Sequence, residues 1–276
     1  MRSLNITSRL LITISLILIY TGLSAQENKP DAGFVPEVGQ QGKDVVWVPT
    51  PDELVNVMLK MSKVTADDYV IDLGSGDGRT VIAAAKIGAR AVGIEYNPDM
   101  VTLSKSNALK EGVGDKTEFI ETDLYEYDLS KATVITMFLL PEINLKLRPR
   151  LLDLKPGTRI VSNTFTMGEW EADFEVTTEE NWNSWNNALM WIVPAKVEGT
   201  WQLGNNQVLI NQEFQMIYGY FVINGKEIPF TDGRLSGNEI TFKIKGDLYT
   251  GMVEGNKMRG TVTNESSKSD WVATKL

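Results

Sequence analysis

The chain has 276 residues, and its 27 Lys and Arg against 36 Asp and Glu give a formal net charge of −9, with neither histidine nor cysteine. The missing residue types exclude disulfides, imidazole bases and Ser-His-Asp or Cys-His catalysis. They also predict no metal site, since zinc would have only carboxylate ligands. The acidic balance predicts no nucleic-acid partner, because such binding needs basic surfaces to neutralise phosphates.

Residues 1–25 have the layout of a secretory signal peptide. Arg2 and Arg9 form a basic start, residues 10–20 are an apolar run, and Ser24 and Ala25 offer a small-residue cleavage end. We therefore expect an exported protein, periplasmic or secreted, whose net charge becomes −11 after cleavage. The alternative is an uncleaved N-terminal membrane anchor, although the apolar run is short for a membrane span.

The net charge and the pattern of predicted secondary structure both change near residue 194. Residues 26–46 are rich in Gly, Pro and polar residues and are predicted to be a tether. Residues 47–194 carry most of the acidic excess, whereas residues 195–276 have nine basic and nine acidic side chains. We expect one domain over 47–194 and a second over 195–276.

Residues 47–194 alternate short apolar runs with longer helical patterns, which predicts a doubly wound α/β sheet with ligands at the carboxyl ends of its strands. The expected helices are residues 51–61, with Thr50 as N-cap, followed by 80–87 and 98–111. The expected strands are residues 69–73, 91–95, 117–121, 133–139 and 158–163, with 174–178 and 188–193 as a closing antiparallel pair.

A glycine-rich loop, Asp72-Leu73-Gly74-Ser75-Gly76-Asp77-Gly78-Arg79, joins the first expected strand to the second helix. Its glycines allow the backbone to approach a ligand closely. A dinucleotide fingerprint would have a third glycine where Arg79 stands, and Asp72 and Asp77 would repel a pyrophosphate. The two carboxylates suit a cationic amino-acid ligand instead.

Two further acids follow the next strands. Glu95 ends the strand 91–95, 23 residues after Asp72, where an acid is placed to bind ribose hydroxyls. Asp123 follows the strand 117–121 and could accept a hydrogen bond from an adenine amino group. The glycine-rich loop and the two acids Glu95 and Asp123 together predict a ligand that has a cationic part, a ribose and an adenine.

With these motifs, residues 47–194 resemble class I S-adenosylmethionine-dependent methyltransferases, so a seven-stranded Rossmann-like sheet is expected. The glycine-rich loop and Glu95-Tyr96-Asn97-Pro98 look like the family's first and second cofactor motifs. The resemblance implies the following cofactor-binding residues: Gly74, Ser75 and Gly76 beside Asp72 for the methionine part, Glu95 for the ribose with Tyr96 next to it in the same motif, and Asp123 with Leu124 beside it for the adenine. The alternative is a glycine-rich turn in a nucleotide-type fold that binds another ligand.

A narrower resemblance rests on Trp47-Val48-Pro49-Thr50-Pro51 ahead of the loop and on the Gly-Ile-Glu-Tyr-Asn-Pro run at 93–98. Both are similar to a group of protein-lysine methyltransferases that includes the mitochondrial ATP-synthase c-subunit lysine methyltransferase and its bacterial relatives. The resemblance implies that Pro49 and Thr50 lie near the methionine end of the cofactor, where the pre-loop segment closes over it. A Pro-rich lead with an N-cap is a simpler and compatible interpretation.

Glu142 and Asn163 are the candidate catalytic residues, because they follow the two strands that should face the transferable methyl group. The Asp/Asn-Pro-Pro-Tyr motif of many amino-methylating enzymes of this fold is absent. Glu142 could orient an amine or take its proton, and Asn163 could line the other side of the pocket. Alternatively, Glu142 begins a solvated helix and Asn163 satisfies loop backbone. Trp182, Trp185 and Trp191 either cage a methylated cation or pack a hairpin against the sheet edge.

The C-terminal domain is predicted to be an antiparallel β barrel or sandwich without a catalytic role. Its seven expected strands are residues 198–203, 208–210, 215–222, 239–244, 249–253, 258–262 and 271–274, separated by Gly-Asn and similar turns. The opening Gly-Thr-Trp at 199–201 resembles the start of lipocalin-like barrels.

These features predict an enzyme that transfers a methyl group from S-adenosylmethionine to an amine, with protein lysine as the first acceptor and a small molecule as the next. Histidine is dispensable for this chemistry, since aligning the nucleophile with the cofactor supplies much of the barrier reduction. Export would take the chain to a compartment where the cofactor is not made. The rival hypothesis is therefore an exported, non-catalytic binding protein on a methyltransferase scaffold.

Overall fold

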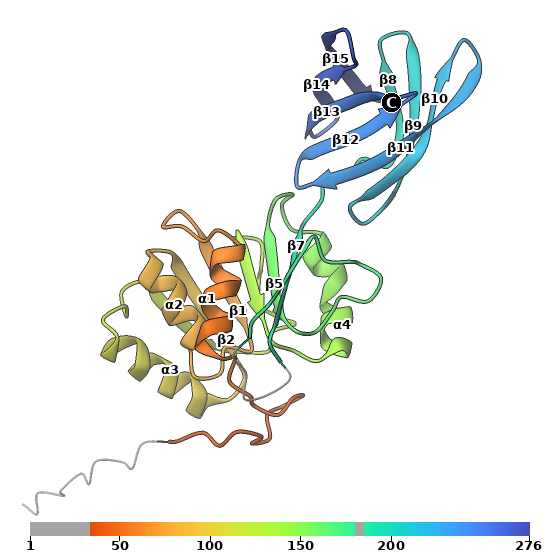
Figure 1. Ribbon diagram of the computed structural model, residues 1–276. Helices are drawn as coiled ribbons and strands as arrows, with labels where there is room; N and C mark the ends of the chain where they lie inside the picture. The colour runs from red at the N-terminus through yellow and green to blue at the C-terminus, as the bar shows by residue number, and fades with distance from the viewer. Residues whose placement is uncertain (1–33, 180–184) are drawn as a thin grey trace, which may run out of the picture. The chain divides into compact units, whose positions relative to one another are not determined.

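A computed structural model describes residues 34–179 and 185–276, so the predicted signal segment lies outside the described residues. The described chain forms a seven-stranded sheet with helices and an eight-stranded closed barrel (Figure 1). Among the described residues, no helix combines the length and the apolar character needed to cross a membrane.

The sheet has the strand order β3-β2-β1-β4-β5-β7-β6, with parallel pairing from β3 to β5 and β7 antiparallel to both neighbours. Its helices are α1 (Asp52–Met61), α2 (Arg79–Ile87), α3 (Pro98–Lys110) and α4 (Pro141–Leu152). Its strands are β1 (Tyr69–Leu73), β2 (Arg90–Glu95), β3 (Thr117–Glu121), β4 (Val134–Met137), β5 (Arg159–Asn163), β6 (Phe174–Thr177) and β7 (Asn187–Ile192). The predicted doubly wound, seven-stranded sheet is confirmed.

Helices cover both faces of this sheet because its central strands are apolar on both sides. Val70 of β1 packs in the cluster that contains residues of α1, α2 and α3. The next residue, Ile71, packs in the cluster that contains Ile143 and Leu147 of α4. Figure 1 shows α4 apart from the other three helices, across the sheet. The carboxyl ends of β1, β2 and β4 are therefore held at one edge of a rigid layer.

The predicted N-cap of α1 is wrong. The helix begins at Asp52, and its N-cap position, Pro51, makes no side-chain capping bond. Thr50 is instead buried, and its Oγ1 accepts a hydrogen bond of 3.3 Å from Asn163 Nδ2. Pro51 fixes its own backbone angle in an extended conformation, which ends the pre-loop segment just before the helix.

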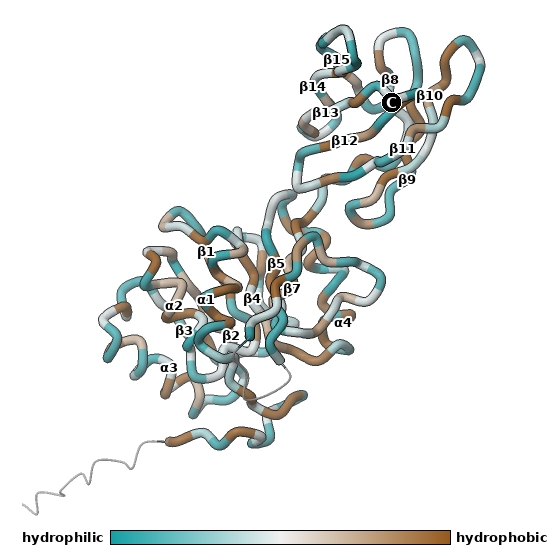
Figure 2. The backbone as a smooth tube through the Cα atoms, viewed as in Figure 1, coloured by the Kyte–Doolittle hydropathy of each residue, from teal (hydrophilic) through white to brown (hydrophobic). Residues whose placement is uncertain are grey.

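The barrel is closed, with the strand order β10-β11-β12-β13-β14-β15-β8-β9, so the barrel alternative holds over the sandwich. Its strands are β8 (Gly199–Leu203), β9 (Asn206–Glu213), β10 (Met216–Ile223), β11 (Lys226–Ser236), β12 (Glu239–Ile244), β13 (Asp247–Glu254), β14 (Lys257–Thr263) and β15 (Lys268–Lys275). Hydrophobic and hydrophilic residues alternate along these strands (Figure 2), as expected where one face is buried and the other solvated.

Sequence analysis missed β11, which is the longest strand of the barrel. This strand contains Pro229 and Gly233, two residue types that disfavour strands, and its pairing with β12 shifts register between Thr231 and Arg234. Gly233 is required there, because an added Cβ would lie 2.2 Å from the carbonyl oxygen of Ile217. The irregular pattern is thus a β-bulge within one continuous strand.

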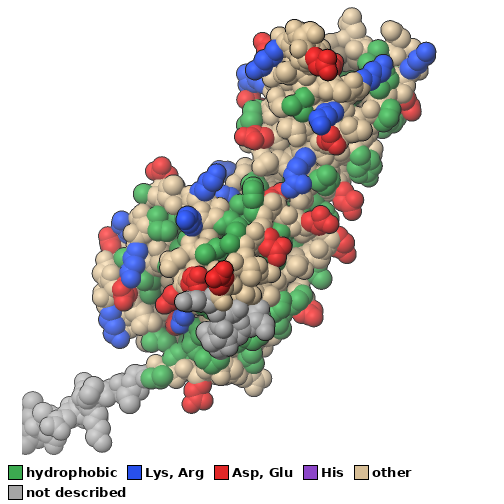
Figure 3. Space-filling model, in the orientation of Figure 1, with side chains coloured by type: hydrophobic (Ala, Val, Ile, Leu, Met, Phe, Trp, Pro, Cys, Tyr) green, Lys and Arg blue, Asp and Glu red, His purple; other side chains and the backbone are tan. Residues whose placement is uncertain are grey.

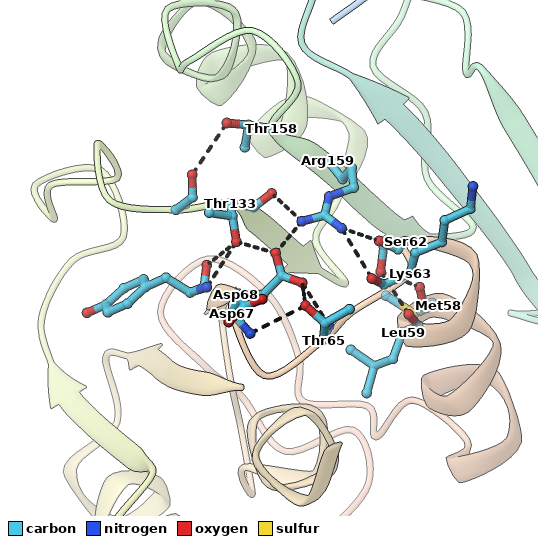
Figure 4. Close-up of polar contacts among 12 residues, drawn as sticks. Met58, Leu59, Ser62, Lys63, Thr65, Asp67, Asp68, Thr133, Thr158 and Arg159 are labelled. Carbon is cyan, nitrogen blue, oxygen red and sulfur yellow. Dashed lines mark hydrogen bonds and ion pairs between the residues drawn. The ribbon is translucent and has the colours of Figure 1, made fainter. Parts of the chain in front are cut away.

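A buried polar cluster ties the amino ends of the central strands together, at the edge opposite the carboxyl ends (Figure 4). Asp68, just before β1, accepts hydrogen bonds from Thr133 Oγ1 at 2.7 Å and from the backbone N–H of Thr65 at 2.8 Å, and it pairs with Arg159. Arg159 also donates to the carbonyl oxygen of Ser62 at 2.7 Å, at the end of α1. The cluster joins β1, β4, β5 and α1.

Candidate functional site

A cavity of about 460 Å³ opens at the carboxyl ends of the strands, a size typical of small-ligand sites. It brings together all ten predicted cofactor-binding residues: Pro49, Thr50, Asp72, Gly74, Ser75, Gly76, Glu95, Tyr96, Asp123 and Leu124. They come from the pre-loop segment, the glycine-rich loop and the ends of β2 and β3, as predicted. Their individual roles toward the cofactor remain predictions.

The glycine-rich loop needs its glycines for conformation and for space. Gly74, Gly76 and Gly78 have φ values of 75°, 54° and 83°, in the left-handed region that side chains disfavour. A Cβ on Gly76 would lie 2.5 Å from Nε1 of Trp47, and one on Gly78 would lie 2.8 Å from the ring of Phe119. The loop therefore presents bare backbone to the cavity at the start of α2.

Glu95 holds the glycine-rich loop as well as facing the cavity. Its Oε2 accepts a hydrogen bond of 3.0 Å from the backbone N–H of Gly76, and its Oε1 accepts from the N–H groups of Tyr96 and Asn97 at 2.9 Å each. An ionised carboxylate has about four acceptor sites, so capacity remains for a ligand hydroxyl. The side chain is therefore fixed before any ligand arrives.

Asp72 is a buried carboxyl group in the cavity wall, 6% exposed, and it accepts a hydrogen bond of 2.6 Å from Thr136 Oγ1 on β4. Burial, helped by the nearby charges of Glu95 and Asp77, raises the pKa of Asp72 to about 7 against the opposing effect of that hydrogen bond. A cation bound in the cavity would relieve this unfavourable charge. The site is therefore suited to a positively charged ligand.

Sequence analysis missed Lys43, which contacts Asp123, the carboxylate predicted to bind the adenine. Its Nζ lies 2.5 Å from Asp123 Oδ2 and 4.6 Å from the centre of the Tyr96 ring. The hydrogen bond from Lys43 is the main reason that the pKa of Asp123 lies below its ordinary value. Lys43 falls within the predicted tether, but the Gly39 N–H donates to the carbonyl of Trp47 and the Trp47 N–H donates to Gln40. Residues 39–46 are thus folded against the cavity. The prediction that they belong to a tether rested only on their composition, which is rich in Gly and polar residues.

Arg79 joins the pre-loop segment to the glycine-rich loop. Its guanidinium donates to both carboxylate oxygens of Asp77 and to the backbone carbonyl of Thr50 at 3.0 Å. Asn163, at the end of β5, contacts the same segment through Thr50 Oγ1. In the sequence Arg79 was notable only for departing from the dinucleotide pattern, and this clamp was not foreseen.

The two catalytic candidates lie in different surroundings. Glu142 is exposed in the first turn of α4 and is not among the described residues that line the cavity, which fits the interpretation as a solvated helix start. Asn163 is fully buried behind Thr50. Their catalytic roles stay predictions.

Aromatic residues line the cavity beside the ends of β4 and β5 instead. Phe138 after β4, Phe165 after β5 and Trp185 before β7 all line it. Of the two interpretations of the tryptophans, the cage does not hold for Trp191, which is buried and donates from Nε1 to the carbonyl of Trp170 at 2.7 Å. Trp182 lies outside the described residues. Sequence analysis placed both strand ends at the pocket but singled out Glu142 and Asn163 there, because single phenylalanines after strands carry no distinctive pattern.

The known proteins that this chain resembles are methyltransferases, which agrees with the cofactor site predicted for this cavity. Residues 72–174 match the ANTKMT methyltransferase domain family. The chain is 41% identical over 152 residues to a protein-lysine N-methyltransferase of Saccharolobus islandicus (strain REY15A), covering 94% of that protein and 54% of this chain. It is 37% identical over 128 residues to the ATP synthase c-subunit lysine N-methyltransferase of Xenopus laevis, covering 46% of this chain and 56% of that protein. It thus spans little more than half the length of that second relative.

A solved structure extends the comparison to the cofactor. The crystal structure of an RNA methyltransferase from Salinibacter ruber in complex with S-adenosyl-L-homocysteine has 46% sequence identity and a TM-score of 0.51, over 54% of this chain and 96% of that chain. The carboxylates and bare loop backbone of the cavity fit a ligand with a cationic amino-acid end, ribose hydroxyls and an adenine. The cofactor is S-adenosylmethionine, and the chain belongs to the class I S-adenosylmethionine-dependent protein-lysine N-methyltransferase family.

Proposed function

We propose that the protein methylates the side-chain amine of lysine in a protein substrate. The observation that carries this proposal is the 41% identity that extends over nearly the whole archaeal protein-lysine N-methyltransferase. The cavity supports it, because its described lining has five acidic side chains, Asp44, Asp72, Asp77, Glu95 and Asp123, but only two basic ones, Lys43 and Arg79. A site with this excess of carboxylates attracts cationic side chains.

When bound, S-adenosylmethionine would supply an electrophilic methyl group and a neutral thioether leaving group. The acceptor ammonium must first give a proton to water, which frees the nitrogen lone pair that takes the methyl group. The residues of this chain bind the cofactor and orient it toward the acceptor amine. Asp72 balances positive charge, Glu95 holds ribose hydroxyls, and Arg79 keeps the pre-loop segment against the loop. Alignment of this kind supplies a large part of the rate enhancement.

RNA is the second candidate acceptor, because the Salinibacter ruber protein is described as an RNA methyltransferase. The charge of residues 26–194 disfavours it, since they carry 16 basic and 27 acidic side chains and RNA needs its phosphates neutralised. On the face visible in Figure 3, basic side chains are interspersed with acidic ones. A small-molecule acceptor and a non-catalytic exported binding protein are the remaining alternatives.

The test supplies the full chain and methyl-labelled S-adenosylmethionine to an extract of its native host. We expect label in protease-sensitive material, and mass spectrometry should find it on lysine side chains. Labelled RNA would favour the second candidate, and labelled small molecules would favour the third. No transfer by a protein that still binds S-adenosylhomocysteine would support the non-catalytic alternative.

Binding of S-adenosylmethionine is expected to depend on pH through Asp72. Because the pKa of this carboxyl group is about 7 without ligand, a cationic cofactor must displace its proton at lower pH. Affinity should therefore rise by up to about tenfold per pH unit below 7 and level off above 8. Calorimetry from pH 6 to 8 on the wild type and on Asp72→Asn checks this. A variant with the same pH profile as the wild type would contradict it.

We further propose that residues 1–25 direct export, with an uncleaved anchor as the alternative. The support is the basic start, apolar run and small-residue end of this segment. Cell fractionation and sequencing of the mature N-terminus decide between the two. A protein that begins at Met1 in the membrane fraction would indicate an anchor, and one that begins at Met1 in the cytoplasm would contradict both.

A further inference from the structure

Three aromatic side chains, Phe138, Phe165 and Trp185, form one wall of the cofactor cavity, which we call the aromatic wall. The rings of Phe138 and Phe165 are stacked with centroids 5.9 Å apart, and Trp185 meets Phe138 edge to face at 5.7 Å. All three are half-buried, so they pack on one another while keeping surface open toward the cavity. The wall is thus a defined apolar surface within the site.

The position of the wall in the sheet assigns it to the acceptor. The strand order β3-β2-β1-β4-β5 puts Asp123 and Glu95 on one side of β1 and the wall residues Phe138 and Phe165 on the other. The ribose and adenine are expected on the β2 and β3 side, and Asp72 with the glycine-rich loop lies between, at the end of β1. Beyond the methionine end of the cofactor, the only side of the described cavity left for the acceptor is the one at β4 and β5, where the wall lies.

The chemistry of the wall suits an alkylammonium group on a flexible apolar stem. Aromatic ring faces attract Lys-type cations, and they pack well against the methylene groups of a lysine stem. The two basic residues of the described lining, Lys43 and Arg79, are paired with Asp123 and Asp77, so they offset two of the five lining carboxylates and leave an acidic excess of three. A cation entering beside the wall therefore meets ring faces and a net negative field.

We propose that the aromatic wall is the subsite that binds the acceptor lysine and recognises its alkylammonium head through the ring faces of Phe165 and Trp185. This inference rests on the proposed lysine acceptor. It assigns to Phe138, Phe165 and Trp185 the role that sequence analysis gave to Glu142 and to a tryptophan cage. Recognition through ring faces also admits the already methylated amine, because methylation keeps the positive charge.

The test measures binding of small probes to the full chain saturated with S-adenosylhomocysteine, by NMR titration. The probes are Nα-acetyl-Nε-trimethyl-lysine methylamide, its neutral isostere with a tert-butyl group in place of trimethylammonium, and adenosine. We expect the cation to bind about fivefold more tightly than the isostere. In Phe165→Leu and Trp185→Leu, which keep an apolar side chain but lose the ring, this preference should fall to about one.

Phe174→Leu is the matched control, because Phe174 is an exposed ring on β6 and is not among the described residues that line the cavity. Its preference should equal that of the wild type, and every variant is titrated at a concentration of S-adenosylhomocysteine that saturates it. Equal binding of the cation and the isostere to the wild type, or a cation preference unchanged in both wall variants, would overturn the inference. So would adenosine binding that depends on the wall without cation binding, which would instead indicate a nucleobase subsite.

These outcomes are separate from those of the proposed function. An enzyme that methylates protein lysine, but whose cation preference ignores Phe165 and Trp185, removes only the wall assignment. A protein that transfers no methyl to lysine fails the proposed function in the labelling experiment, while the probe titration still reports whether the wall binds alkylammonium ions.

Discussion

Replacement of Glu95 by alanine is expected to weaken binding of S-adenosylhomocysteine by at least about 100-fold, as measured by calorimetry. The loss has two sources. The ribose hydroxyls lose a charged acceptor, and hydrogen bonds to charged groups contribute about 1.5–3 kcal/mol each. In addition, the N–H groups of Gly76, Tyr96 and Asn97 lose the carboxylate that holds the loop in shape.

Glu121→Ala is the matched control for this experiment. Glu121 ends β3 and is the register partner of Glu95 on β2, so the same charge is removed from the same level of the neighbouring strand. Its side chain is exposed and is not among the described residues that line the cavity. This variant should bind within about twofold of the wild type. Equal losses in both variants would mean that general charge, rather than the ribose contact, governs affinity.

The cofactor side of the site was predictable because its residues follow strand ends in the sequence. Asp72, Glu95 and Asp123 each lie at or just after the carboxyl end of a strand, and parallel strands bring these ends to one edge. Knowing the strands was therefore enough to place the three acids around one cavity. The glycines were equally readable, because their positive φ values leave few other residue types possible.

The contacts of Lys43 and Asn163 and the aromatic wall were less predictable, because they depend on contacts between distant segments. Lys43 reaches Asp123 across 80 residues of chain, and Asn163 reaches Thr50 across 113. No pattern among residues close together in the sequence indicates such contacts. The aromatic wall has the same character, since Phe138, Phe165 and Trp185 become neighbours only when β4, β5 and β7 are placed side by side. In the barrel, β11 was not predicted because its β-bulge interrupts the alternating pattern that marks a strand.

The polar cluster around Asp68 is expected to stabilise the fold without affecting the cofactor. Asp68→Asn keeps the shape of the side chain but removes the charge that Arg159 and Thr133 contact. Removing one partner of a fully buried ion pair costs about 3 kcal/mol or more, and a smaller loss is expected here because the Arg159 side chain is 23% exposed. Denaturant unfolding should show this loss. Affinity for S-adenosylhomocysteine should stay within about twofold of the wild type, since the cluster lies at the opposite edge of the sheet.

The pH dependence of this loss separates the ion pair from simple side-chain packing. Burial raises the pKa of Asp68, but the hydrogen bonds from Thr133 and Thr65 and the charge of Arg159 lower it more, so the net pKa is below the ordinary value. The stability that the carboxylate contributes is then present above about pH 4 and is lost as the pH falls through the lowered pKa. The difference between wild type and Asp68→Asn should accordingly shrink from pH 6 to pH 3. Asp67→Asn, which changes the exposed neighbour, should match the wild type throughout. A difference that stayed constant with pH would mean that Asp68 acts through its shape and not through its charge.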